Sequence, residues 1–198
     1  MTFRALLLLV HLQAVLIPIL IGIKSINRFK QIRFPLLPPF AFISLGLASM
    51  FEMFDHTTTD WIYVDHSSIY NWLFYSFLSI GLSFFTISVA KNKSIITSNI
   101  LLIIAAVFSY WFLGKSTTLL IQVLISILLI SQWWKRFKDW VFFIYPITGV
   151  IFTTFFGILL SSSGEQIWHV FIGPSGTISV LAFYAVLKRS RKKEIISA

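Results

Sequence analysis

The chain has 198 residues, of which 57% are hydrophobic and only 12% are charged, and its mean hydropathy is +0.86. These values exclude a soluble globular domain, because a water-facing surface needs far more polar and charged side chains. The net charge of +9 does not indicate a nucleic-acid-binding protein, since the 16 Lys and Arg residues form short clusters between apolar runs. The chain contains no cysteine, so a metal ion would need His and carboxylate ligands.

Seven apolar segments follow one another along the chain, joined by short polar connections. A helix that crosses a bilayer core of roughly 30 Å needs about 20 apolar residues. The pattern therefore predicts an all-α, integral, multi-pass membrane protein: a seven-transmembrane helix bundle that forms a single domain over residues 1–198. The expected spans lie near residues 5–23, 35–54, 68–90, 95–113, 117–134, 140–161 and 167–187. The first is expected to be a retained span, because its apolar run reaches Ile23 without a small-residue cleavage site.

The basic residues predict the orientation of the bundle, because Lys and Arg near span ends are retained on the cytoplasmic side. Fourteen of the 16 basic residues lie after the first, third, fifth and seventh spans, which leaves only Arg4 and Lys115 on the other side. We therefore expect the N-terminus outside and the C-terminus in the cytoplasm. Under this topology most acidic and histidine residues gather near the outer face, namely Glu52, Asp55, His56, Asp60, Asp65, His66, Glu165 and His169.

Two of the expected spans carry a Glu-x-x-x-His pair near the outer face. Glu52 and His56 end the second span, and Glu165 and His169 begin the seventh. Residues four apart project from the same helical face, and imidazole nitrogen and carboxylate oxygen bind a divalent ion at about 2.0–2.2 Å. An ionised side chain at membrane depth costs roughly 2.5–3.5 kcal/mol, so such residues generally mark function. The alternative is a buried hydrogen-bonded set that only stabilises helix packing, at about 0.6 kcal/mol for each interhelical bond.

The remaining polar residues of this region have simpler interpretations. Asp55, Asp60 and His66 are expected at or beyond the membrane edge, in a polar outer loop where water solvates them. His11, in the outer part of the first span, is expected to be a hydrogen-bonded interior residue rather than a metal ligand.

The motifs "EMFDHTT" and "EQIWHVFIG", at the end of the second span and the start of the seventh, resemble those of the CREST superfamily of membrane hydrolases. That group contains the alkaline ceramidases and the progestin and adipoQ receptors with their hemolysin III type relatives. The family has Ser-x-x-x-His in span two and His-x-x-x-His in span seven. His56 and His169 stand at two of the family's His positions, whereas Glu52 replaces the Ser and Glu165 replaces the other His.

The resemblance implies a zinc-dependent, ceramidase-like hydrolase that acts on the amide or ester of a membrane lipid. His56, His169 and Glu165 would hold the zinc ion, which leaves one position for a water molecule whose pKa falls towards 7. Glu52 or Asp65 would accept the proton of that water. Asp65 corresponds loosely to the family's Asp near the top of span three, and Asp60 is the alternative. From the residues alone, a proton or cation transporter and a structural or assembly protein stay open as non-enzymatic alternatives.

Overall fold

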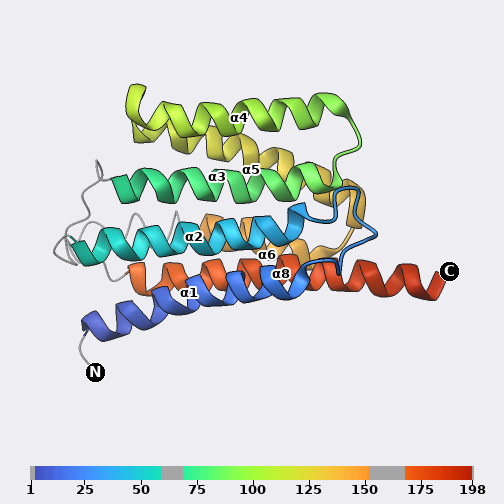
Figure 1. Cartoon of the computed structure of the whole chain (residues 1–198), viewed down its shortest axis with the longest axis horizontal. Helices are drawn as coiled ribbons and strands as arrows, with labels where there is room; N and C mark the ends of the chain where they lie inside the picture. Colours follow the sequence, from blue (N-terminus) through green and yellow to red (C-terminus); the bar gives the residue numbers. More distant parts are fainter. Residues whose placement is uncertain (1–2, 59–68, 152–167, 198) are drawn as a thin grey trace.

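The computed structural model of the chain describes residues 3–58, 69–151 and 168–197, and these residues form helices and connecting turns without a β-strand. The long helices lie side by side along the long axis of the molecule (Figure 1). Their bounds are α1 Phe3–Ser25, α2 Leu37–Thr58, α3 Ile69–Val89, α4 Lys93–Phe112, α5 Lys115–Phe137, the 3-10 helix η1 Trp140–Phe143, α6 Ile144–Ile151 and α8 Trp168–Ser197.

Five of these helices, α1 to α5, are long and apolar enough to cross a membrane. They lie on the first five expected spans. The expected sixth span starts differently, with the turn η1, because the Asp139 carboxylate accepts a hydrogen bond from the Val141 N–H at 3.1 Å and caps that turn. The last helix, α8, continues beyond the expected end at residue 187, and this polar extension projects past the other helices in Figure 1.

Helices α2 and α3 form the centre of the bundle. They pack on each other, with α1 and α8 on one side of the pair and α4 and α5 on the other (Figure 1). Burial agrees with this order, since 56% of the α3 span is buried but only 22% of the α4 span. The outer helix α4 leaves large apolar side chains such as Leu101 and Phe108 exposed, as expected for a surface that faces lipid.

An aromatic cluster joins five elements of the bundle. It consists of Phe42 from α2, Phe85 from α3, Trp133 from α5, Phe142 from η1 and Phe183 from α8. The rings of Phe85 and Phe183 stack with centroids 4.5 Å apart, and Trp133, 0% exposed, lies edge-on to both. The Trp133 indole also donates a hydrogen bond to the Phe85 carbonyl at 2.9 Å. The cluster therefore fixes α8 and the start of α6 against the central pair.

Glycines let helices approach closely, and Gly46 and Gly173 are two examples. A Cβ atom on Gly46 of α2 would lie 2.8 Å from the Val15 carbonyl oxygen and 2.6 Å from the Ile19 side chain of α1. A Cβ atom on Gly173 of α8 would lie 2.5 Å from the Val10 carbonyl oxygen. Only glycine fits these contacts, so small residues bring α1 against both α2 and α8.

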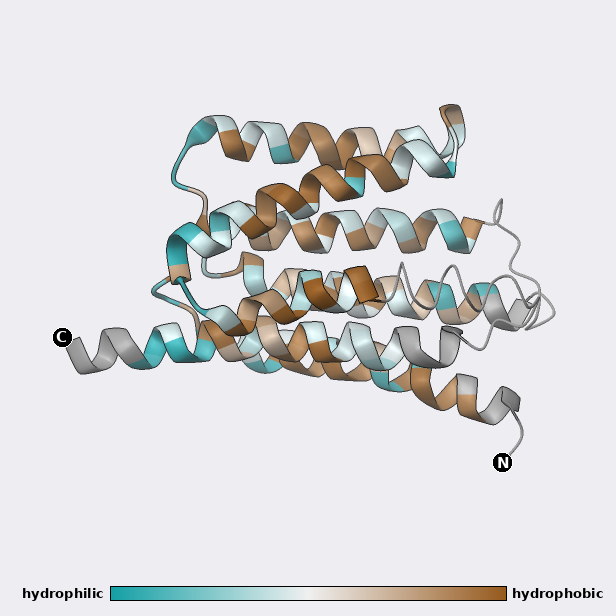
Figure 2. Cartoon of the chain, turned by 180° about the vertical axis from the view of Figure 1, so that it is seen from behind, coloured by the Kyte–Doolittle hydropathy of each residue, from teal (hydrophilic) through white to brown (hydrophobic). Residues whose placement is uncertain are grey.

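Most basic residues gather at one end of the bundle, which we call the basic end: the turns before α2, before α4 and before η1, together with the last turns of α8. Hydrophilic residues are frequent there in Figure 2. Arg33 donates hydrogen bonds to the carbonyls of Ala90 and Lys91 at 2.9 and 2.6 Å, and Arg189 pairs with Asp139 at 3.3 Å. The basic side chains thus also connect neighbouring turns.

Candidate functional site

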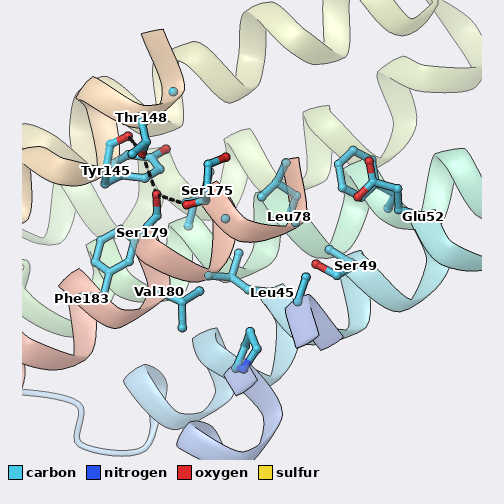
Figure 3. A pocket seen from close by; sticks show the side chains of 18 residues that line it. Leu45, Ser49, Glu52, Leu78, Tyr145, Thr148, Ser175, Ser179, Val180 and Phe183 are labelled. Carbon is cyan, nitrogen blue, oxygen red and sulfur yellow. Dashed lines mark hydrogen bonds between the residues drawn. The ribbon is translucent and has the colours of Figure 1, made fainter. Parts of the chain in front are cut away.

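A cavity of about 290 Å³ lies within the bundle, between α1, α2, α3, α6 and α8 (Figure 3). Its walls are mainly apolar because these five helices turn aliphatic and aromatic side chains towards it. The apolar lining includes Leu45, Phe74, Leu78, Leu82, Val180 and Phe183. Small-molecule sites are typically concave and mostly apolar, with a few polar groups that orient the ligand.

The polar groups of the cavity lie in two separate places. Glu52 and Ser49 of α2 line one end, whereas Thr148 of α6 and Ser175 and Ser179 of α8 line the other (Figure 3). Leucine side chains lie between the two ends in the same view. Among the lining residues that the structure describes, Glu52 is the one Asp, Glu, His, Lys or Arg. The cavity therefore has one carboxyl end and one hydroxyl end.

Glu52 interacts electrostatically with His11, Asp55 and Lys115, and also with Tyr75. His11 comes from α1 and is only 1% exposed, which confirms that it is an interior residue. Lys115 is the first residue of α5, and its ammonium group lies 5.4 Å from the centre of the Tyr75 ring. A cation at a helix N-terminus is disfavoured by the helix dipole. Electrostatic attraction to the carboxyl groups of Asp55 and Glu52 opposes this unfavourable effect.

Asp55 corrects one expectation from the sequence. It was expected at the membrane edge and solvated by water, but it is only 1% exposed. The reason is that α2 continues to Thr58, so that Asp55 still lies inside the helix and towards α3. Its carboxylate accepts a hydrogen bond from the Asn71 amide at 3.3 Å, and the Tyr110 hydroxyl donates to the Asn71 carbonyl oxygen at 3.2 Å. This chain of hydrogen bonds joins α2, α3 and α4.

Of the predicted catalytic and metal-binding residues, Glu52 is the one whose side chain the structure describes, and it lines the cavity. His56 lies one turn further along α2, and His169 is the second residue of α8, but their side chains lie outside the described part. The predicted residues that fall outside the described ranges are Asp60, Asp65, His66 and Glu165. Within the described residues no three or more His, Asp or Glu side chains form a group that could hold a metal ion. The zinc site stays a prediction.

Lys115, Asn71 and Tyr110 could not be assigned to this polar region from the sequence pattern. One signal was available: Lys115 is one of two basic residues that depart from the charge asymmetry of the loops. A lysine on the otherwise acidic side is a candidate partner for buried carboxylates. Asn71 and Tyr110 carry no such signal, because an amide or a phenol within an apolar span is compatible with many positions.

Comparison with known proteins supports the architecture. Residues 3–193 match the family described as "Seven transmembrane receptor". No curated protein and no solved structure matches the chain. Together with the five long apolar helices, the family match shows that the protein is an integral, multi-pass membrane protein, and it leaves the resemblance to CREST hydrolases as a prediction. The chain belongs to the seven transmembrane receptor family.

Proposed function

We propose that the protein is a receptor-like membrane protein that binds a small amphiphilic molecule in the cavity between α1, α2, α3, α6 and α8. The observation that carries this proposal is the cavity of about 290 Å³, with apolar walls, one carboxyl end and one hydroxyl end. Its volume is close to the lower limit of about 300 Å³ for ligand pockets. The description of the family as receptors agrees with a ligand-binding role.

The charge asymmetry supports an orientation for this receptor. With the basic end in the cytoplasm, the N-terminus is outside and the Glu52 end of the cavity is directed towards the outer side of the membrane. A ligand would then enter from the outer leaflet or the outer solution. The aromatic cluster and the basic turns would lie on the cytoplasmic side of the cavity.

Ligand binding at Glu52 would also affect helices that do not line the cavity. Glu52 interacts electrostatically with Lys115 of α5 and with Asp55, which is hydrogen-bonded through Asn71 to α4. A ligand shifts a conformational equilibrium only if it interacts differently with the two states. A charged ligand group beside Glu52 meets this condition, because it changes the electrostatic interaction of Glu52 and Asp55 with the Lys115 ammonium group.

The test is photolabelling with a diazirine analogue of 1-octanol in lipid nanodiscs, with the labelled residues identified by mass spectrometry. We expect labelling of cavity residues that excess 1-octanol suppresses. Gly149→Leu and Gly176→Leu should abolish it, because both glycines line the cavity and an added Cβ meets no atom within 4 Å. Val123→Leu, at an exposed position of α5, is the matched control and should keep the labelling. Labelling of cavity residues that neither competitor nor glycine variants reduce would contradict the proposal.

A second candidate is zinc-dependent hydrolysis of a lipid amide or ester at the same end of the cavity. It is favoured by the position of Glu52, the proposed proton acceptor, at the cavity wall. Gly173, one turn after His169, also packs against the backbone of Val10, the neighbour of His11. The helices that carry His169 and His11 therefore meet near this end.

The zinc ligands proposed for this candidate are the imidazoles of His56 and His169 and the carboxylate of Glu165. This set of donors is chemically suited to zinc. Elemental analysis of the purified protein tests it. We expect close to one zinc per chain in the wild type and loss of the metal in the His56→Ala, His169→Ala double variant. Wild-type protein purified without chelators that contains no zinc would remove this candidate and leave ligand binding unaffected.

A further inference from the structure

Two turns of the basic end are joined to α8 where this helix leaves the bundle. In the turn before α2, the Gln31 amide donates a hydrogen bond to the Leu187 carbonyl of α8 at 3.4 Å. The backbone carbonyl of Gln31 in turn accepts a hydrogen bond from Arg136, at the end of α5, at 3.3 Å. In the turn before η1, Asp139 pairs with Arg189 of α8 at 3.3 Å. Segments that are far apart in the sequence therefore meet around the last turns of α8.

These contacts gather cations into one exposed area, which we call the cationic patch. Its side chains are those of Lys30, Arg136, Lys138, Lys188, Arg191 and Lys192, and all of them are exposed. Asp139 is the one acidic residue of these segments whose side chain the structure describes, and its carboxylate already caps η1 and pairs with Arg189. The patch therefore carries an excess of positive charge. Retention of Lys and Arg on one side of a membrane does not require neighbouring turns to bring them together.

The length of α8 places the cationic patch at the depth of lipid headgroups. Leu187 is 0% exposed and belongs to the same buried cluster as Phe183. The next residues of α8, 188–192, rise by about 7.5 Å at 1.5 Å per residue. The headgroup layer on each side of a bilayer core is roughly 5–8 Å thick. Lys188, Arg191 and Lys192 are therefore within reach of the phosphates of the leaflet that surrounds this end of the bundle.

Exposed apolar side chains beside the patch favour a lipid over a soluble acidic partner. Trp140, in the turn η1, is 73% exposed, and its ring packs on Trp134 with centroids 4.8 Å apart. Phe34 and Leu36, in the turn before α2, are exposed as well. Tryptophan is enriched at membrane interfaces, where its ring lies at headgroup level. A soluble partner would leave these side chains in water after it dissociates, whereas a bilayer covers them permanently.

We propose that the cationic patch binds the headgroup of an anionic phospholipid from the surrounding leaflet. Lys and Arg side chains of α8 and of the turn before η1 contact the phosphate oxygens, and the acyl chains lie along the apolar surface next to Trp140. No residue of the patch lines the cavity. The lipid site is therefore separate from the proposed ligand site and does not rest on the receptor function.

Native mass spectrometry of the full chain in detergent micelles tests the lipid site by titration with dioleoyl phosphatidylglycerol or dioleoyl phosphatidylcholine. The two lipids have the same acyl chains and differ in the net charge of the headgroup. We expect phosphatidylglycerol to reach half occupancy of the first bound lipid at a concentration at least about tenfold lower. Equal occupancy by the two lipids would overturn the proposal. Displacement of phosphatidylglycerol by an equal concentration of glycerol 3-phosphate, which has no acyl chains, would also overturn it.

A matched pair of double variants distinguishes a defined site from general attraction to a basic protein. Arg191→Gln, Lys192→Gln removes two charges from the patch and should lower the preference for phosphatidylglycerol at least about fivefold. Lys91→Gln, Lys93→Gln removes two exposed charges from the turn before α4, which lies away from α8 in Figure 1, and should keep the preference. All four side chains are exposed, so both variants should fold. Equal losses in the two variants would show attraction by net charge alone and would overturn the proposed site.

Discussion

Gly173 and Gly176 lie three residues apart in α8, yet replacing each with alanine should change stability in opposite directions. At Gly173 the new Cβ would lie 2.5 Å from the Val10 carbonyl oxygen, a backbone atom that no side-chain rotation can move. At Gly176 the new Cβ would meet no atom within 4 Å. The chemical change and the helix are the same, so the difference between the variants isolates the contact of α8 with α1.

The magnitudes follow from two opposing effects. Alanine stabilises a helix interior by about 0.8–1.0 kcal/mol relative to glycine, and this gain applies at both positions. Overpacking at a tight contact costs about 1–3 kcal/mol, and this loss applies only at Gly173. We therefore expect Gly176→Ala to stabilise the protein by up to about 1 kcal/mol. Gly173→Ala should be about 1–3 kcal/mol less stable than Gly176→Ala.

We test this expectation by measuring the free energy of unfolding in mixed micelles. The wild type and both variants are compared under the same conditions. Labelling of the cavity by the diazirine probe gives a second measurement, because Gly173 lines the cavity and its displacement would change the wall. Equal stability of Gly173→Ala and Gly176→Ala would refute the reasoning, since it would mean that α8 does not pack against the Val10 backbone.

Three further variants test the core and the polar network. Trp133→Phe removes the hydrogen bond to the Phe85 carbonyl and should lower the free energy of unfolding, measured by denaturation, by roughly 1 kcal/mol or more. Unchanged stability would argue against the aromatic cluster as a stabilising centre. Asn71→Leu removes a hydrogen-bond partner from both Asp55 and Tyr110 and should cost about 1–3 kcal/mol in the same assay, whereas a neutral effect would contradict the network. Lys115→Met should destabilise the protein, and adding Asp55→Asn should restore part of the lost stability. In a double-mutant cycle we expect a coupling energy of at least about 0.5 kcal/mol. Simple additivity of the two substitutions would exclude an electrostatic contact between Lys115 and Asp55.

The positions of the membrane helices could be predicted from the sequence because a bilayer imposes a minimum length on an apolar segment. The expected span near 68–90 and the helix α3, Ile69–Val89, are an example. Such a pattern does not determine which face of a helix is turned inwards, because lipid-facing and interior side chains are equally apolar. This is why α3 could not be recognised as a central helix and α4 as an outer helix before their burial was known.

The candidate site was predictable only in part. Glu52 could be identified, because a carboxylate between Phe51 and Met53 is costly at membrane depth. Asp55, three residues later, was assigned to the water-exposed edge, because the sequence does not mark where α2 ends to within one turn. Its burial depends on Asn71, a partner supplied by another helix.

The sequence by itself determined the class of protein, a helical bundle in a membrane, because hydrophobic segment length and the distribution of charge act locally along the chain. Only the tertiary structure decided that Glu52 opens onto a cavity whose far end is formed by Thr148 and Ser179. Glu52 is separated from both residues by about half of the chain or more, and the helices that carry it and Ser179 are held together by the close approach of α1 to α2 and α8. That approach is set by the packing of small residues against backbone atoms, which a pattern of hydrophobicity does not record.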